Sequence, residues 1–235
     1  MKTLIIIPAY NEAQNILSVA GELVDGYPQY DFVVVNDGSR DDTASVCKNA
    51  GFSLIDLPVN IGLTGGVQAG MRYAQRMGYD YAVQLDGDGQ HDPAYISELL
   101  SAIQSDDLDF VIGSRFVGVK KPLKPRMIGS LIISLAIFLT TGKKISDPTS
   151  GMRLYNKRLI KLMANSMDLG PEPDTLAYLI RSGAKFCEVP VIMKERSAGE
   201  SYLNFSRAFR YMVDILFSII LLMWVRKKNI VNGDK

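Results

Sequence analysis

A short apolar strand runs into a glycine-containing acidic turn in the stretch YAVQLDGDGQHDP, residues 81–93. Asp86 and Asp88 stand at positions i and i+2, so in an extended segment their side chains point the same way and can share one hard cation. Gly87 and Gly89 have no Cβ, which lets a bulky anion approach the backbone. A divalent ion held by one or two carboxylates keeps free positions for diphosphate oxygens. Asp-Gly pairs also mark ordinary surface turns, so this stretch alone leaves both interpretations open.

Apolar runs alternate with helical patterns on both sides of this turn. Strands are predicted at residues 4–7, 32–35, 52–57, 81–85 and 110–112, with helices at about 11–26, 42–51, 65–77 and 94–104. This alternation predicts parallel βαβ units in a doubly wound α/β sheet. Ligands of such sheets bind at the carboxyl ends of the strands. Polar clusters follow three predicted strands, at 10–12, 37–39 and 86–88, so we expect one polar site at that edge.

The composition excludes several classes of protein. The chain has 235 residues, which is enough for one large α/β domain, and a formal net charge of +1, which gives little reason to expect nucleic acid. Its two cysteines, Cys47 and Cys187, are far apart and argue against a disulfide scaffold and for a reduced compartment. The first apolar run is too short for a secretory signal. We therefore expect the catalytic side to be cytoplasmic.

The second half of the chain carries two apolar runs flanked by cations. Residues 128–141 would span about 21 Å as a helix, short of a hydrocarbon core of about 30 Å. Residues 211–225 are similar, and Arg207, Arg210, Asp214 and Ser218 are predicted near one helical face. Basic clusters at 120–126 and 226–228 adjoin the runs. The pattern favours helices lying in a membrane interface, although two core helices or a dimer interface would fit as well.

Six motifs carry the remaining signal. They are IIIPAYNE (5–12), VVNDGSRDDT (34–43), DGD (86–88), IGSRF (112–116), SDPTSGMR (146–153) and ERSAGES (195–201). Together they resemble glycosyltransferase family 2 with the GT-A fold, in the polyprenyl-phosphate branch that includes dolichol-phosphate mannose synthase and bacterial undecaprenyl-phosphate sugar transferases. The resemblance implies a GT-A catalytic domain over 1–205, including an interface helix at about 126–142. A C-terminal amphipathic membrane-associating helix and basic tail would follow over 206–235.

The resemblance also implies a nucleotide-sugar site. The residues expected to bind the nucleotide are Pro8, Tyr10, Glu12, Asp37, Gly65, Asp86 and Arg196. The metal set is Asp86, Asp88 and Gln90, holding Mg²⁺ or Mn²⁺, which would neutralise the leaving diphosphate. Arg196 would clasp the diphosphate, because a guanidinium stays charged and can bind two oxygens at once. Relatives often have Lys after the Ser of that last motif, whereas this chain has Tyr202. Glu12 also fits a plain acid in the first turn of a helix.

The acceptor implied by the resemblance is a lipid phosphate. A phosphomonoester is already largely dianionic at neutral pH, so the protein needs mainly to position it and offset its charge. The residues expected at that phosphate are Arg115, Lys121, Arg126 and Arg153, and those expected to be catalytic are Asp147, Asp88 and Arg115. Asp147 matches an acid with a base or acceptor-orienting role, but it also fits a cap or an ion pair with Arg153. Whether Asp147 or Asp174 would act as a base stays open.

The predicted function is inverting transfer of a sugar, from UDP-N-acetylglucosamine or UDP-glucose, to undecaprenyl phosphate for cell-wall or surface-polysaccharide modification. One alternative is transfer to a hydroxyl of a lipid-linked glycan, and another is a non-catalytic nucleotide-sugar-binding subunit. The expected location is the cytoplasmic face of the cell membrane, as a peripheral or monotopic protein. Expected partners are the membrane surface and a small membrane protein or a second copy of the chain.

Overall fold

The structure is a computed structural model that describes residues 1–119, 121, 125–194 and 205–222. One seven-stranded sheet runs through it in the order β3-β2-β1-β4-β6-β5-β7. The strands are β1 (Thr3–Ala9), β2 (Asp31–Asp37), β3 (Leu54–Leu57), β4 (Tyr81–Gln84), β5 (Phe110–Ser114), β6 (Arg153–Asn156) and β7 (Phe186–Pro190). The helices are α1 (Ile16–Gly26), α2 (Thr43–Asn49), α3 (Gly62–Met77), α4 (Ile96–Ser105), α5 (Pro125–Thr141), α6 (Lys157–Ala164), α7 (Pro173–Arg181) and α8 (Phe205–Phe217). A short 3₁₀ turn, η1 (Pro93–Tyr95), precedes α4, and a π-helical turn, η2 (Ser218–Leu222), follows α8.

The strand pairing confirms the predicted α/β class with a mostly parallel sheet. β1 pairs in parallel with β2 and β4, β2 with β3, and β5 with β7. β6 runs antiparallel between β4 and β5. Because both neighbours oppose β6, they run in the same direction, and their carboxyl ends meet at one edge of the sheet.

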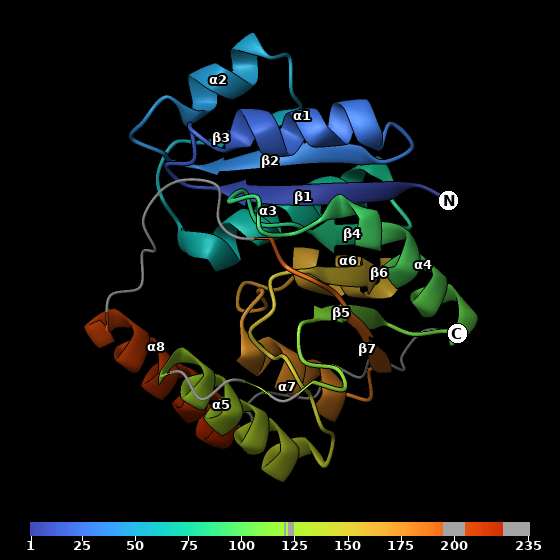
Figure 1. The fold of residues 1–235 in the computed structure, drawn as a ribbon, viewed down its shortest axis with the longest axis vertical. Coiled ribbons are helices and arrows are strands. Elements are labelled where there is room, and N and C mark those ends of the chain that lie inside the picture. The colour runs from blue at the N-terminus through green and yellow to red at the C-terminus, as the bar shows by residue number, and fades with distance from the viewer. Residues whose placement is uncertain (120, 122–124, 195–204, 223–235) are drawn as a thin grey trace.

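Helices cover both faces of this sheet (Figure 1). Along β1 the buried side chains alternate, with Leu4 and Ile6 on one face and Ile5 and Ile7 on the other. The first face packs against α3, α5, α6 and α7, and the second against α1, α2 and α4. Each fully buried Leu or Ile side chain stabilises the fold by about 1.5–3 kcal/mol. The continuous apolar run of β1 is therefore explained by burial on both faces.

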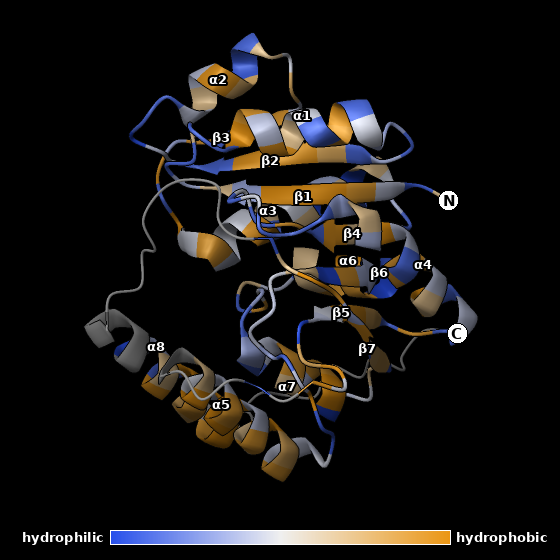
Figure 2. Ribbon diagram, viewed as in Figure 1, coloured by the Kyte–Doolittle hydropathy of each residue, from blue (hydrophilic) through white to orange (hydrophobic). Residues whose placement is uncertain are grey.

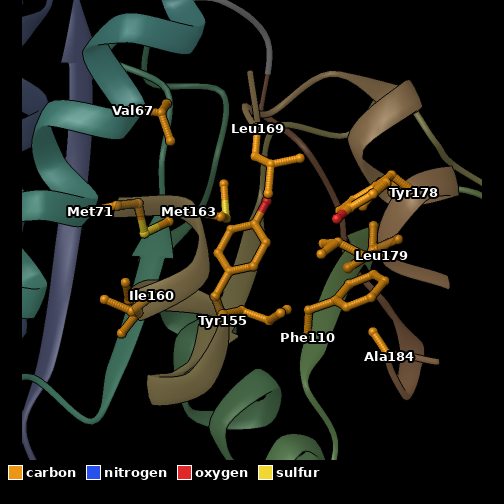
Figure 3. Packing of buried hydrophobic residues seen from close by; sticks show 14 of the residues in the cluster. Val67, Met71, Phe110, Tyr155, Ile160, Met163, Leu169, Tyr178, Leu179 and Ala184 are labelled. Carbon is orange, nitrogen blue, oxygen red and sulfur yellow. The ribbon is translucent and has the colours of Figure 1, made fainter. Parts of the chain in front are cut away.

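The core beneath the second half of the sheet is built around β6. Figure 3 shows Tyr155 of β6 in the middle of the cluster, between Met163 of α6 and Phe110 of β5. The Phe110 ring stacks on Phe186 of β7, with ring centroids 5.2 Å apart. β6 and β7 were not predicted from sequence, because β6 has four residues and begins with Arg153, a charged residue assigned to a motif.

The pair of helices α5 and α8 lies at the far end of the molecule from α2 (Figure 1). Ile133 and Ile137 of α5 and Ile215 of α8 are buried in the core. The opposite side of the pair is apolar and exposed, with large side chains at Ile128, Leu131, Ile132, Leu135, Phe138, Leu139, Val213, Phe217, Ile220 and Leu221. Figure 2 shows the resulting hydrophobic colouring along both helices. We call these ten residues the apolar face. In the described part of the chain, no helix is both long and apolar enough to cross a membrane.

Two local predictions are corrected by the structure. Helix α1 begins at Ile16 rather than near residue 11, because Asn11 adopts a left-handed backbone conformation with φ 55° and belongs to a loop. Ser218 is buried and donates to Asp174 Oδ2 at 2.5 Å, instead of sharing an exposed edge with Asp214. The change from α8 to the π-helical turn at Ser218 breaks the 3.6-residue period on which that prediction depended. The division at residue 205 stays a prediction, and the basic tail at 226–228 lies outside the described residues.

Candidate active site

The loops after β1 and β2 are joined by side-chain hydrogen bonds. Asn11 N donates to Ser39 Oγ at 2.9 Å, and Arg40 N donates to Asn11 Oδ1 at 2.9 Å. Glu12 is buried, its backbone N donates to Thr43 Oγ1 at 3.0 Å, and its Oε2 accepts from Asn15 Nδ2 at 2.7 Å. These bonds fix the two loops against each other beside Tyr10, at the carboxyl edge of the sheet.

Asp37 at the end of β2 holds the start of α3. Its Oδ1 accepts from Ile61 N at 2.7 Å and its Oδ2 accepts from Gly62 N at 2.9 Å. A carboxylate at this position accepts hydrogen bonds from free N–H groups at the start of the helix. Its negative charge also interacts favourably with the positive end of the helix dipole. A Cβ at Gly66 would lie 3.9 Å from Pro8 Cβ and 4.0 Å from Asp37 Cβ, so α3 packs closely on both strands. Predicted residues Pro8 and Asp37 are thereby brought together.

Gly65 also lies in the first turn of α3. A Cβ at this position would come within 2.6 Å of the Ile61 side chain, so glycine keeps the turn tight. The predicted nucleotide residues Pro8, Tyr10, Glu12, Asp37 and Gly65 thus all lie on the carboxyl edge of the first half of the sheet.

The acidic turn follows β4 at the same edge. Asp86 Oδ1 accepts from Gln84 Nε2 at 3.2 Å, and Asp88 Oδ1 accepts from Gln90 N at 3.1 Å. His91 is buried, and its Nδ1 accepts from Asp86 N at 3.0 Å, which requires an unprotonated Nδ1. His91 therefore fixes the backbone of the turn from inside it.

Two glycines let the turn pack tightly. A Cβ at Gly151 would come within 2.8 Å of Asp86 Cγ, so the Asp86 carboxylate lies directly against the backbone of the loop before β6. A Cβ at Gly87 would lie 3.2 Å from Pro8 O, which places the turn against the end of β1. The acidic turn is thus held between the nucleotide-side loops and the loop at 147–151.

The donor set of this turn fits a partly coordinated hard cation. Asp86 and Asp88 offer carboxylate oxygens and Gln90 an amide oxygen, which are the ligand types that Mg²⁺ and Mn²⁺ prefer. Within the ranges that the structure describes, no group of three or more His, Cys, Asp or Glu side chains could hold a metal ion. A metal at this turn would therefore take part of its coordination from a ligand.

A second polar centre follows β5. Asp147 is fully buried, and its carboxylate binds Arg115 through a fork, with Nε to Oδ2 at 2.6 Å and Nη2 to Oδ1 at 2.7 Å. Arg115 N also donates to Oδ2 at 3.1 Å, and Thr149 Oγ1 donates to Oδ1 at 3.3 Å. The ion pair anticipated as an alternative for Asp147 therefore exists, but with Arg115 rather than Arg153.

Lys121 joins Arg115 in this centre. Its Nζ donates to Ser130 Oγ at 2.9 Å and Ser134 Oγ at 3.3 Å, both on α5. Lys121 Nζ and Arg115 Cζ lie 5.3 Å and 5.2 Å from the centroid of the Phe116 ring. Burial lowers the pKa of Lys121, and the neighbouring Arg115 charge acts in the same direction, against the opposing effect of Asp147. A second anion at this centre would offset the repulsion between the two cations.

Arg153 lies apart from this pair. It is fully buried on β6, and it donates from Nε to Ser150 O at 2.9 Å and from Nη2 to Pro148 O at 2.8 Å. Its guanidinium therefore fastens the loop that carries Asp147. This placement does not support the predicted contact with an acceptor phosphate.

Two acids lie at the start of α7, Glu172 and the alternative base Asp174. Glu172 Oε1 accepts from Thr64 Oγ1 of α3 at 2.6 Å, and burial raises the pKa of Glu172. Asp174 is buried and accepts from Ser218 Oγ. Glu172 thus connects α7 to the first turn of α3, and Asp174 connects it to the end of α8.

Some predicted residues are not described. Arg196 lies outside the described ranges, as do Lys120 and Lys124, and the side chain of Arg126 is not described either. The chain nevertheless approaches the acidic turn just before Arg196, because Lys194 N donates to Gln90 O at 2.8 Å.

Three residues in these contacts were missed by sequence reasoning. Gln84 supports Asp86, Gly151 makes room for it, and Glu188 of β7 accepts from Ser146 N at 2.7 Å and Asp147 N at 2.9 Å. The only sequence signal for Gln84 was an amide within an apolar strand, and the only one for Glu188 was a carboxylate within an apolar strand.

The chain is similar in sequence to known sugar transferases. The chain is 35% identical over 217 residues to the undecaprenyl-phosphate mannosyltransferase of Micrococcus luteus, covering 87% of this chain and 88% of the relative. It is 30% identical over 217 residues to the polyprenol monophosphomannose synthase of Mycolicibacterium smegmatis, covering 86% and 81%.

The fold is also found among solved structures. Glucosyl-3-phosphoglycerate synthase from Mycobacterium tuberculosis, in complex with Mn²⁺, UDP and phosphoglyceric acid, superposes with a TM-score of 0.67. The match covers 93% of this chain and 78% of that one, at 17% identity, and confirms the predicted GT-A fold. The model described as "Glycosyl transferase family 2" matches residues 4–163. The chain therefore belongs to glycosyl transferase family 2 and is a glycosyltransferase.

Proposed function

We propose that this glycosyltransferase moves a sugar from a nucleoside diphosphate to a polyprenyl phosphate, with inversion at the anomeric carbon. The observation that carries the proposal is the pairing of two sites at one edge of the sheet. The acidic turn suits a metal–diphosphate, and the Arg115–Lys121 centre suits a second phosphate next to the apolar face. The Asp86 carboxylate packs on Gly151, and Ser150 Oγ donates to Gly113 O at 2.5 Å, so one loop connects the two sites.

The reaction needs little proton transfer. An oxygen of the acceptor phosphate attacks the anomeric carbon, and the bond from that carbon to the diphosphate breaks with its electron pair. The products are a sugar phosphodiester of the lipid and a free nucleoside diphosphate. Because the acceptor is already an anion at neutral pH, Arg115 and Lys121 have only to hold it and offset its charge.

The remaining residues act on the donor. The loops around Tyr10, Glu12 and Asp37 would hold the base and ribose, and Asp86, Asp88 and Gln90 would hold Mg²⁺ or Mn²⁺. A bound divalent ion would stabilise the charge that develops on the leaving diphosphate. Arg196 remains a proposed second cation at that diphosphate, on the strength of its motif alone.

Mannose is the sugar that we expect. Both relatives described above are named for mannose, and they share 35% and 30% of aligned residues with this chain. The sequence resemblance favoured UDP-N-acetylglucosamine or UDP-glucose instead, and those donors remain the alternatives to test.

The apolar face supports a place for the enzyme on a membrane surface. Its exposed apolar side chains lie on α5, α8 and η2, and exposed Lys143 and Lys144 follow α5. Apolar side chains can enter the acyl boundary while cations meet anionic headgroups. Lys121 contacts Ser130 and Ser134 of the same helix, so a lipid phosphate could reach it while the tail stays in the bilayer. The cytoplasmic leaflet is the surface that we expect.

The deciding experiment supplies the purified protein with Mg²⁺ or Mn²⁺ and a panel of GDP-mannose, UDP-glucose and UDP-N-acetylglucosamine. Each donor is paired with undecaprenyl phosphate in vesicles or with a soluble oligosaccharide. We expect a metal-dependent lipid product, with GDP-mannose the best donor. If product forms on the oligosaccharide alone, the acceptor is a sugar hydroxyl and not the lipid phosphate. Donor binding with no product on either acceptor would favour a non-catalytic subunit.

A further inference from the structure

We propose that Glu188 is a positioning residue that orients Arg115 for the acceptor phosphate, through the loop that carries Asp147. The inference rests on the proposed function and goes beyond it, because Glu188 lies on the edge strand β7 and belongs to none of the recognised motifs. It also assigns Asp147 a role that differs from that of a base.

Glu188 grips the backbone of the Asp147 loop. Its Oε2 accepts from Ser146 N at 2.7 Å and its Oε1 accepts from Asp147 N at 2.9 Å. β7 pairs with β5 in register, with Glu188 beside Ile112. The same pair of strands therefore sets the position of Glu188 and, three residues after Ile112, the position of Arg115.

The carboxylate of Asp147 is already fully engaged. It is completely buried, it accepts three N–H groups of Arg115, and it is within hydrogen-bond distance of the Thr149 hydroxyl. A group that accepts this many bonds is poorly available to take a proton, and a phosphate dianion has none to give at the attacking oxygen. Asp147 therefore acts on the acceptor through Arg115.

This arrangement leaves one end of Arg115 for a substrate. Nε and Nη2 are bound to Asp147, and among the described residues Nη1 has no hydrogen-bond partner. The side chain is 24% exposed, whereas that of Asp147 is 0% exposed. The buried Asp147 carboxylate determines the direction of the Arg115 guanidinium. Glu188, through the backbone N–H groups of Ser146 and Asp147, determines the position of that carboxylate.

Glu188→Gln tests the first link of this chain. An amide offers only one acceptor oxygen, and its NH₂ group would face a backbone N–H, so the loop should shift. We expect KM for undecaprenyl phosphate to rise about tenfold or more, with KM for the nucleotide sugar and the Kd for Mn²⁺-nucleoside diphosphate unchanged. Glu98→Gln, an exposed carboxylate on α4, is the matched control and should leave both values unchanged.

A double-mutant cycle separates positioning from simple support of the fold. In an Arg115→Ala background, Glu188→Gln should cost little further activity, because the residue that it orients is gone. An equal additional loss in that background would overturn the proposal. So would a loss of nucleotide binding in Glu188→Gln, which would indicate general damage.

A structural readout keeps the inference independent of the proposed function. In crystals of Glu188→Gln, the Arg115–Asp147 fork should be displaced or broken. An unchanged fork would overturn the inference even if the enzyme uses polyprenyl phosphate. Wild-type protein that makes no lipid product would instead defeat the proposed function, while the crystal comparison would still decide whether Glu188 positions Arg115.

The pH dependence distinguishes Asp147 from a base. Asp147→Asn should raise KM for the lipid phosphate and leave the acid limb of the pH–rate profile in place, since no proton is taken by this side chain. Disappearance of that limb, with KM unchanged, would identify Asp147 as the base and contradict its positioning role.

Discussion

The two halves of the proposed site are built in different ways. The proposed donor half consists of the loops after β1, β2 and β4, each of which follows a parallel strand and carries its own motif. The proposed acceptor half assembles β5, the loop before β6, β7 and α5, and its key contacts join residues more than thirty positions apart, such as Arg115 with Asp147 and Asp147 with Glu188. Local sequence therefore describes the donor half better than the acceptor half.

The halves also differ in what surrounds them. On the proposed donor side, carboxylates accept from uncharged N–H groups: Asp37 from the backbone of Ile61 and Gly62, and Glu12 and Asp86 from the side-chain amides of Asn15 and Gln84. The acceptor centre pairs charged side chains with each other next to an exposed apolar surface. A polar site for a soluble nucleotide needs no exposed apolar surface, whereas a site open to lipid needs one beside it.

The largest effect is expected at the acidic turn. Asp88→Ala should lower kcat/KM about a thousandfold, because it removes a carboxylate from the proposed metal site. Asp25→Ala, an exposed carboxylate on α1, is the control and should keep full activity. Full activity of Asp88→Ala, or of the wild type in excess chelator, would show that the donor half works without the metal.

A smaller effect is expected where the two halves touch. A Cβ at Gly151 would overlap the Asp86 carboxylate, so Gly151→Ala should displace it and lower kcat/KM about 10- to 100-fold. Gly21→Ala in α1 is a matched change, because nothing lies within 4 Å of its added Cβ. Steady-state kinetics that show equal activities for the two variants would mean that the loop at 147–151 does not hold Asp86.

The apolar face gives a third way to separate the halves. Leu135→Glu with Phe217→Glu should weaken binding to anionic vesicles about tenfold or more, because each inserted side chain is worth about 1.5–3 kcal/mol at most. The two side chains belong to residues that are 56% and 55% exposed, and the control Leu17→Glu changes one that is 54% exposed on α1. Co-sedimentation should fall only for the double variant, and sugar transfer from the nucleotide donor to a short-chain, water-soluble prenyl phosphate should persist. Equal vesicle binding by the double variant and the Leu17→Glu control would show that the apolar face does not bind the membrane.

The smallest effect concerns Glu172, which joins α7 to the donor half. Burial raises the pKa of Glu172 in the folded protein above its ordinary value of about 4.5. The stability that the neutral side chain contributes is therefore fully present below pH 4.5, and it is lost as the pH rises through the raised pKa of the folded state. Glu172→Gln stays neutral and keeps an acceptor for Thr64. It should therefore be more stable than wild type at pH 7, with the difference shrinking toward pH 4.5.

Urea unfolding across that pH range measures the difference, with Glu98→Gln as the exposed control. A stability difference that does not change with pH would show that ionisation of Glu172 is not what burial penalises.

The sequence by itself determined the α/β class, the acidic turn and the loops of the donor half. Apolar runs such as residues 4–7 and the motifs behind them are contiguous, and the carboxyl ends of parallel strands must meet at one edge. A seven-stranded order with β6 reversed in the middle did not follow, because strand order depends on contacts between distant segments.

Only the tertiary structure decided which cations come together at the proposed acceptor centre. From the sequence, Arg115, Lys121 and Arg153 are equally good candidates to bind a phosphate. The fold buries Arg153 against backbone carbonyls and pairs Arg115 with Asp147. It also decided that the apolar runs are half buried and half exposed, since the inward side of α5 packs on the core and the outward side does not. The physical reason is common to both: desolvation and ion pairing depend on which distant segments cover a side chain, and residue order does not record that.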